Sequence, residues 1–271
     1  MRLWNKLRNR LRRGRSGPVK VDVRQQLKHK VPDATDRQLD ILQWVHPYTM
    51  TSPERILAVC NAVEYVVRSG VEGSFVECGV WRGGSTAAAA LTLKQLGESD
   101  RELWLYDTFE GMSEPSKQDV DCWGYDAEQL LTEQDPDDAE SVWCVSALQE
   151  VKDVILETGY PQERTRFIVG KVEETLPTQR PEKIALLRLD TDWYESTRCE
   201  MEELFPRLQP GGVLIIDDYG HWKGCRKAVD EYIANNSINI FLNRIDYTGR
   251  LGIKMSESLK DGNLKSLSHV A

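Results

Sequence analysis

A β-rich run passes directly into a glycine-rich turn at FVECGVWRGGST, residues 75–86. The first half predicts a strand, and the end predicts the start of a helix. Glycine permits the tight turn and lets a ligand approach the backbone closely. A turn of this kind follows the first strand of doubly wound α/β sheets, where nucleotide-like cofactors bind. The stretch therefore predicts an α/β fold with a cofactor site in this turn.

The side chains of this turn narrow the choice of ligand. The turn lacks the G-x-G-x-x-G pattern of dinucleotide sites, and no G-x-x-x-x-G-K-[ST] phosphate loop occurs in the chain. Glu77 could receive an amino group, and Arg82 could pair with a carboxylate. Asp107 ends the next predicted strand, where such folds hydrogen-bond ribose hydroxyls; its alternative role is to form a turn or cap a helix. A nucleoside joined to an amino acid, as in S-adenosylmethionine, is favoured over NAD.

Strands alternate with helices from residue 74 onward. The apolar runs do not alternate with polar residues, as expected of strands buried on both faces of a parallel sheet. Strands are predicted at residues 74–79, 102–107, 166–170, 183–190 and 212–217, and helices at residues 85–96, 146–157, 194–208 and 224–235. Residues 238–246 and 250–255 flank Tyr-Thr-Gly and predict a β-hairpin. We therefore expect a Rossmann-like, doubly wound, mostly parallel seven-stranded sheet with a C-terminal antiparallel hairpin.

Two helices are predicted before the first strand. Thr35 and Gln38 have the spacing of a capping box. Ser52 and Pro53 supply an N-cap and a first-turn proline for a second helix that ends near residue 68.

The composition is that of one globular domain: 271 residues, 40% hydrophobic and 29% charged. No stretch reaches the roughly 20 apolar residues that span a bilayer. The six cysteines are scattered without a C-x-x-C pair, which disfavours a disulfide framework or a zinc site and favours a cytoplasmic location.

The net charge of −8 is unevenly distributed. Residues 1–15 carry seven basic residues and no acid, which leaves the remainder near −15. The negative charge of the chain after residue 15 disfavours nucleic acid as a partner, because binding to phosphates needs a positive surface. The N-terminus is predicted either to be a disordered basic leader or to touch an anionic membrane surface weakly as an amphipathic helix. We predict a leader and linker at 1–33, the catalytic domain at 34–258 and a tail at 259–271.

Four carboxylates follow two predicted strands that lie side by side. Asp190 and Asp192 follow the strand at 183–190, and Asp217 and Asp218 end the strand at 212–217. Crowded carboxylates raise one another's pKa unless a cation neutralises them. Oxygen ligands without Cys or His suit Mg²⁺, Mn²⁺ or Ca²⁺ better than zinc. Neighbouring strand residues point oppositely, so Asp217 and Asp218 could both bind a metal only if the backbone turns there.

A long segment at residues 113–145 interrupts the alternation of strands and helices. Its part from Asp119 to Glu140 holds nine acids and no lysine or arginine. Long excursions at the carboxyl end of a strand are often active-site lids. A solvated acidic surface loop is the equal alternative.

The chain resembles the macrocin O-methyltransferase (TylF-like) family of class I, metal-dependent sugar O-methyltransferases. The resemblance covers roughly residues 45–255. It is carried by Thr49-Met50, by ECGVWRGG at 77–84, by YDTFEGM at 106–112, by ETLP at 174–177, by LDTDWYEST at 189–197, and by Pro210-Gly211-Gly212 through Asp217-Asp218-Tyr219.

The resemblance implies an enzyme that transfers a methyl group from S-adenosylmethionine to a hydroxyl of a sugar-containing small molecule. It implies that Asp190, Asp217 and Asp218 hold Mg²⁺ or Mn²⁺, with Asp192 as general base; His221 is the alternative base. It also implies a cofactor site made of Thr49, Met50, Glu77, Gly79, Trp81, Arg82, Gly83, Gly84, Ser85, Asp107 for the ribose and Ser146 near the adenine.

Two other functions remain open at this point. The acceptor could be a phenol or catechol, since Trp123, Trp193 and Trp222 near the mouth could stack on an aromatic ring or on a sugar face. The chain could also be a noncatalytic protein that keeps the fold, although its complete set of acids argues against this. The sugar, the hydroxyl position and the choice between a monomer and a homo-oligomer are not predicted.

Overall fold

The computed structural model describes residues 22–136 and 141–256. Most of the predicted leader and linker at 1–33 lies outside these residues. The predicted tail at 259–271 lies entirely outside them. Helix α2, Val23–Lys30, falls inside the segment that the sequence assigns to leader and linker. Its buried Leu27 belongs to the hydrophobic core, so this helix packs with the rest of the domain.

Within the described residues, seven strands form one sheet in the order β3-β2-β1-β4-β5-β7-β6. Strands β1 to β5 pair in parallel, whereas β7 pairs antiparallel with β5 and with β6. The predicted fold is therefore confirmed. The strands are β1 (Ser74–Cys78), β2 (Leu103–Asp107), β3 (Thr165–Val169), β4 (Ile184–Leu189), β5 (Leu208–Ile216), β6 (Asn243–Arg244) and β7 (Arg250–Ile253).

The first strand of the predicted hairpin is much shorter than expected. Only Asn243 and Arg244 of residues 238–246 pair with β7. Ile238, Ile240 and Leu242 pack against the hydrophobic core instead of extending the ladder. Apolar contacts therefore replace strand pairing over this segment.

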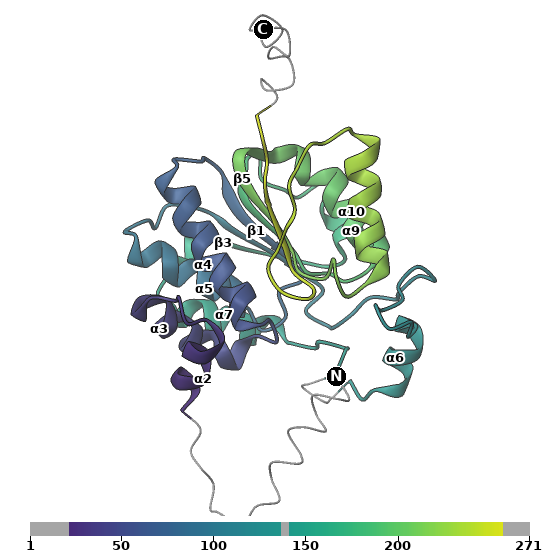
Figure 1. Cartoon of the computed structure of the whole chain (residues 1–271), viewed down its shortest axis with the longest axis horizontal. Helices are drawn as coiled ribbons and strands as arrows, with labels where there is room; N and C mark the ends of the chain where they lie inside the picture. Colours follow the sequence, from purple (N-terminus) through teal and green to yellow (C-terminus); the bar gives the residue numbers. More distant parts are fainter. Residues whose placement is uncertain (1–21, 137–140, 257–271) are drawn as a thin grey trace, which may run out of the picture.

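Helices cover both faces of the sheet (Figure 1). On one face lie α2, α3 (Asp36–Val45), α4 (Pro53–Arg68), α5 (Gly84–Gln95) and α7 (Leu148–Glu157). On the other lie α6 (Ala127–Glu133), α8 (Val172–Thr175), α9 (Tyr194–Glu203) and α10 (Lys223–Asn235). Short 3-10 helices occur at His46–Tyr48, Gln162–Arg164 and Phe205–Arg207. None of the described helices is both long enough and apolar enough to span a bilayer.

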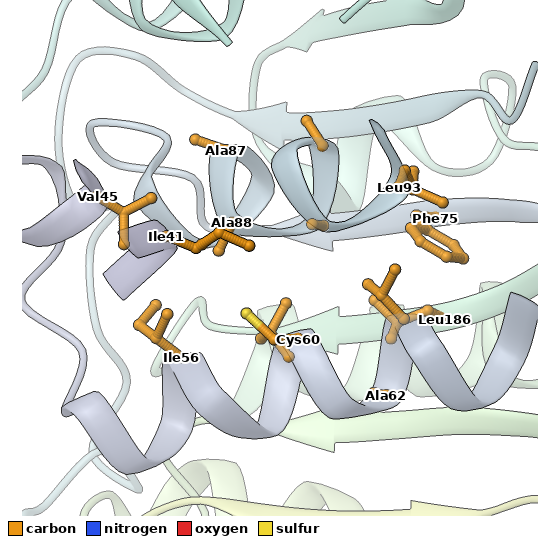
Figure 2. Packing of buried hydrophobic residues seen from close by; sticks show 14 of the residues in the cluster. Ile41, Val45, Ile56, Cys60, Ala62, Phe75, Ala87, Ala88, Leu93 and Leu186 are labelled. Atoms are coloured by element: carbon orange, nitrogen blue, oxygen red, sulfur yellow. The ribbon is translucent and has the colours of Figure 1, made fainter. Parts of the chain in front are cut away.

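Small side chains allow α5 to pack closely against its neighbours. Ala87 and Ala88 are fully buried, and Figure 2 shows Ala88 between Ile41 and the side chains of α4 such as Cys60. Phe75 of β1 closes the same apolar layer near Leu93 (Figure 2). This packing fixes α5, and with it the glycine-rich turn that precedes the helix.

Both predicted N-caps are present. Thr35 and Gln38 form the capping box at the start of α3. The Ser52 hydroxyl accepts from the Arg55 backbone N–H at 3.2 Å and donates to Asp246 Oδ2 at 2.8 Å. Arg55 Nε also donates to Asp246 Oδ2, at 3.0 Å. The start of α4 is thereby tied to the turn between β6 and β7, at the edge where the site lies.

Candidate active site

A cavity of about 230 Å³ opens at the carboxyl edge of the parallel strands. The segment before α4, the turn after β1 and the ends of β2, β4 and β5 all contribute to it. Most of the predicted site residues line this cavity: Thr49, Met50, Glu77, Gly79, Trp81, Gly84, Ser85, Asp107, Asp190, Asp192, Asp217 and Asp218. The structure therefore brings these predicted residues together at the carboxyl edge of the sheet.

The turn after β1 needs glycine for two distinct reasons. Gly79 has φ +79°, and a Cβ there would lie 2.0 Å from the carbonyl oxygen of Asp190. At Gly84 a Cβ would lie 2.5 Å from the carbonyl oxygen of Tyr48. These close approaches bring the segment after β4 and the Thr49-Met50 segment against the turn.

Asp107 anchors this turn through its carboxylate. Its Oδ2 accepts from the backbone N–H groups of Val80 and Trp81 at 2.7 and 3.0 Å, and its Oδ1 accepts from that of Phe109 at 2.7 Å. The turn-forming role that the sequence left open is therefore present. Asp107 also lines the cavity, so its predicted contact with a ribose stays a prediction.

Four predicted residues do not line the cavity. Arg82 donates to the carbonyl of Pro47 at 3.4 Å, away from the position expected for a ligand carboxylate. Gly83 is the left-handed N-cap of α5, and a Cβ there would meet Val151. The remaining two are Ser146, which is buried near Glu150, and His221.

Arg188 is the centre of the charged groups in the site, and sequence reasoning missed it. It is 2% exposed, and its guanidinium donates to Glu77 Oε1 at 2.6 Å, Asp190 Oδ2 at 2.7 Å and Asp217 Oδ1 at 2.7 Å. Glu77 also accepts from the hydroxyl of Thr86. Glu77 therefore has protein partners for its carboxylate, and its predicted contact with an amino group of the cofactor stays a prediction. One feature of the sequence could have identified it: Arg188 is the single charged residue in the otherwise apolar run of residues 184–189.

Asp217 and Asp218 face different partners. Asp217 is 2% exposed and forms ion pairs with Arg188 and Arg55. Its backbone N–H continues the sheet by donating to the carbonyl of Leu189 at 2.9 Å. Because the strand continues through Asp217, the adjacent Asp218 points elsewhere. The expected metal group of Asp190, Asp217 and Asp218 is therefore not the one that this structure brings together.

Asp218 lies instead with Asp190 and Asp192. Carboxylate oxygens of these three residues lie within 4.8 Å of one another. Asp192 has φ +68°, and the backbone N–H of Trp193 donates to the carbonyl of Thr191 at 2.7 Å. This tight turn is costly for a residue with a Cβ, and such conformations concentrate at functional sites.

The three carboxylates are held in an environment that disfavours their charge. Burial raises the pKa of Asp190 to about 7, although Arg188 opposes the shift. Burial also raises the pKa of Asp192 to about 7, and that of Asp218 well above its ordinary value, with Asp192 adding to the latter shift. Among the described residues, Asp218 Oδ2 is buried and has no hydrogen-bond partner. An oxygen-only group with an unpartnered buried carboxylate oxygen fits a hard divalent cation.

His221 lies outside the carboxylate group. Its ring contacts Trp123, Trp222 and Tyr247, with centroids 5.3, 4.9 and 6.1 Å away. Trp222 in turn packs against Trp193 at 4.9 Å, and both are buried. Only Trp123, which is 61% exposed, can therefore stack on a ligand as predicted for all three tryptophans.

The first part of the acidic segment is tied to the domain. Asp119 is fully buried and accepts from the backbone N–H of Tyr194 at 2.7 Å. The backbone N–H of Lys223 donates to the carbonyl of Val120 at 2.9 Å. These bonds hold residues 119–126 against the starts of α9 and α10. Whether the segment acts as a lid stays a prediction, and residues 137–140 lie outside the described part.

Comparison with known proteins identifies the family of this chain. The sequence model of the macrocin O-methyltransferase (TylF) family matches residues 15–251. The chain belongs to the macrocin O-methyltransferase family. The resemblance seen in the sequence is thereby confirmed, and the protein is an enzyme with O-methyltransferase activity.

Two similar curated proteins are named as O-methyltransferases, and the name of one specifies a rhamnosyl group on its substrate. The chain is 37% identical, over 80% of each protein, to the 8-demethyl-8-(2,3-dimethoxy-alpha-L-rhamnosyl)-tetracenomycin-C 4'-O-methyltransferase of Streptomyces olivaceus. It is 35% identical to the mycinamicin III 3''-O-methyltransferase of Micromonospora griseorubida, over 74% of this chain and 76% of the relative.

Solved structures agree with the family. The O-methyltransferase NovP has a TM-score of 0.68 and 30% identity, covering 77% of this chain and 83% of NovP. The calicheamicin methyltransferase CalS11 has a TM-score of 0.57, covering 89% of this chain and 94% of CalS11. At 19% identity, the likeness to CalS11 supports the fold alone.

Proposed function

We propose that the enzyme transfers the methyl group of S-adenosylmethionine to a sugar hydroxyl of a glycosylated small molecule, with Mg²⁺ or Mn²⁺ bound beside the acceptor. The observation that carries this proposal is the group of Asp190, Asp192 and Asp218 next to the glycine-rich turn. The sugar acceptor is supported by the tetracenomycin and mycinamicin relatives, whose names specify methylation at primed positions.

The cofactor would occupy the cavity beside the turn after β1. Gly79 and Gly84 let the segments after β4 and before α4 approach this turn, and Thr49 and Met50 line the same cavity. Asp107 stands where a ribose hydroxyl would be bound. S-adenosylmethionine supplies an already activated methyl group, so the protein mainly positions the acceptor for attack.

The metal would be held by Asp190 and Asp218, whose carboxylates already lie together. When bound, such a cation lowers the pKa of a coordinated hydroxyl, which a sugar needs because it is a very weak acid. Asp192 then accepts the hydroxyl proton. Its pKa near 7 suits a general base at neutral pH. Asp217, paired with two arginines, would neutralise and position Arg188 and Arg55.

A methyl-transfer screen tests the proposal. Glycosylated metabolites, nucleotide sugars and catechols would be offered with S-adenosylmethionine, with and without Mg²⁺. We expect metal-dependent turnover of glycosides. Robust turnover of catechols with none of sugars would favour a phenolic acceptor, and failure to bind S-adenosylmethionine in calorimetry would favour a noncatalytic protein.

Asp192→Asn is expected to reduce turnover by roughly 10²-fold or more, because the amide cannot accept the proton. The affinity for S-adenosylmethionine should remain nearly unchanged. Asp153→Asn is the matched control, since Asp153 is an exposed carboxylate on α7 that contacts Gln149. Turnover in Asp192→Asn equal to that of this control would remove Asp192 from the mechanism.

A further inference from the structure

Three aromatic side chains from separate segments meet beside the carboxylate group. Trp123 comes from the acidic segment, His221 from the turn after β5, and Tyr247 from the turn before β7. The ring centroids of Trp123 and His221 are 5.3 Å apart, those of Trp123 and Tyr247 are 6.4 Å apart, and those of His221 and Tyr247 are 6.1 Å apart. We call these three residues the aromatic group.

Hydrogen bonds hold the backbone at Trp123 in place, although the side chain of Trp123 is exposed to solvent. Asp121 is 3% exposed, and its Oδ1 accepts from the backbone N–H groups of Trp123 and Tyr125 at 2.9 and 2.8 Å. Asp121 also forms a backbone bridge with Trp222. Yet the Trp123 side chain is 61% exposed and that of Tyr247 is 51% exposed. Large exposed rings on an anchored backbone mark a binding surface rather than a loose loop.

The aromatic group is continuous with the reaction centre. The backbone N–H of His221 donates to the carbonyl of Asp218 at 2.9 Å. Thr248, next to Tyr247, donates its hydroxyl to the carbonyl of Asp217 at 2.7 Å. An acceptor whose sugar hydroxyl lies at Asp218 therefore has the aromatic group within reach of its remaining part.

The charge and chemistry of this surface select the kind of group that it binds. The described part of the acidic segment, from Asp119 to Asp135, has six acids and no lysine or arginine, which disfavours the phosphates of a nucleoside diphosphate. Aromatic rings favour a flat, uncharged ring system.

We propose that Trp123, His221 and Tyr247 bind the aglycone of the acceptor, and that this aglycone is a neutral, flat ring system. This inference rests on the proposed function.

The test compares the binding of three probes to the full chain loaded with S-adenosylhomocysteine and Mg²⁺: 2-naphthyl rhamnoside, methyl rhamnoside and thymidine-diphosphate rhamnose. The wild type should bind the naphthyl glycoside about tenfold more tightly than the methyl glycoside. Trp123→Ala should weaken naphthyl glycoside binding about five- to tenfold and leave methyl glycoside binding unchanged. Tyr125→Ala is the matched control, since Tyr125 lies on the same loop and is 59% exposed but does not belong to the aromatic group.

Three results would overturn the inference: no preference of the wild type for the naphthyl glycoside, equal weakening of both glycosides in Trp123→Ala, or tightest binding of the nucleotide sugar. Equal weakening would mean that Trp123 contacts the sugar itself. Because the measurement is binding, a lack of methyl transfer to every glycoside would count against the proposed function and not against this surface.

Discussion

Removal of divalent metal with EDTA is expected to reduce methyl transfer by roughly 10³-fold or more, and added Mg²⁺ should restore it. The size follows from losing several kcal/mol of stabilisation of the developing oxyanion, at about 1.4 kcal/mol for each tenfold. Initial rates measured before and after chelation, and again after titration with Mg²⁺, check this. Full activity in excess chelator would rule out a role for the metal.

The dependence of activity on Mg²⁺ concentration should change when a candidate metal ligand is substituted. Asp218→Asn should need a much higher Mg²⁺ concentration for activity, because the unpartnered buried carboxylate is the strongest candidate ligand.

Asp190 and Asp192 have pKa values of about 7, so in the absence of metal they are largely protonated at pH 6 and ionised at pH 8. Mg²⁺ bound by Asp190 must displace the proton of that carboxyl group, so its affinity should be at least about tenfold weaker at pH 6 than at pH 8. A pH-independent affinity would contradict this account.

Much of the fold could be predicted because local chemistry determines it. The capping residues Thr35 and Ser52 stand at the starts of α3 and α4 as predicted. Apolar runs located the five parallel strands, and parallel pairing then brought the residues after β4 and β5 to one edge. The location of the site therefore follows from the sequence once the strand neighbours are known.

Some element boundaries depended on contacts distant in sequence. Strand β5 begins at Leu208, before the predicted residue 212, and Gly211 and Gly212 are in contact with Lys254 through backbone hydrogen bonds of 2.7 and 2.9 Å. Helix α9 ends at Glu203 rather than near 208, and the chain continues as a 3-10 helix that contains Pro206. The extension of β5 therefore depends on the pairing of Leu208 with Ile184 of β4 and on the hydrogen bonds with Lys254, both distant in the chain.

The orientation of each acid in the site could not be predicted from sequence. Which of Asp217 and Asp218 faces Asp190 depends on ion pairs with Arg55 and Arg188. These arginines lie far from the Asp pair in sequence, and no local pattern links them. The sequence shows how many carboxylates lie at the carboxyl edge of the sheet. Which of them are neutralised depends on their ion pairs with buried arginines.

Arg188→Met is expected to lower the free energy of unfolding by roughly 3–5 kcal/mol, because it leaves buried carboxylates without their cation. Arg188 is the shared partner of Glu77, Asp190 and Asp217. The control is Arg198→Met on α9, where the arginine side chain is 46% exposed and pairs with exposed glutamates. Such surface pairs contribute about 0–1 kcal/mol. Urea denaturation of both variants gives the comparison.

The pH dependence of Arg188→Met separates lost charge pairing from lost packing. In the wild type, burial already raises the pKa of Glu77 and of Asp190 to about 7 although Arg188 opposes the shift, so without this cation both carboxyl groups should hold their protons to a still higher pH. A carboxylate whose pKa is raised by folding destabilises the folded state as pH rises through the interval between the two values. The loss in unfolding free energy should therefore be larger at pH 8 than at pH 5. An equal loss at both values would assign the effect to the cavity left by the side chain and would contradict the central ionic role of Arg188.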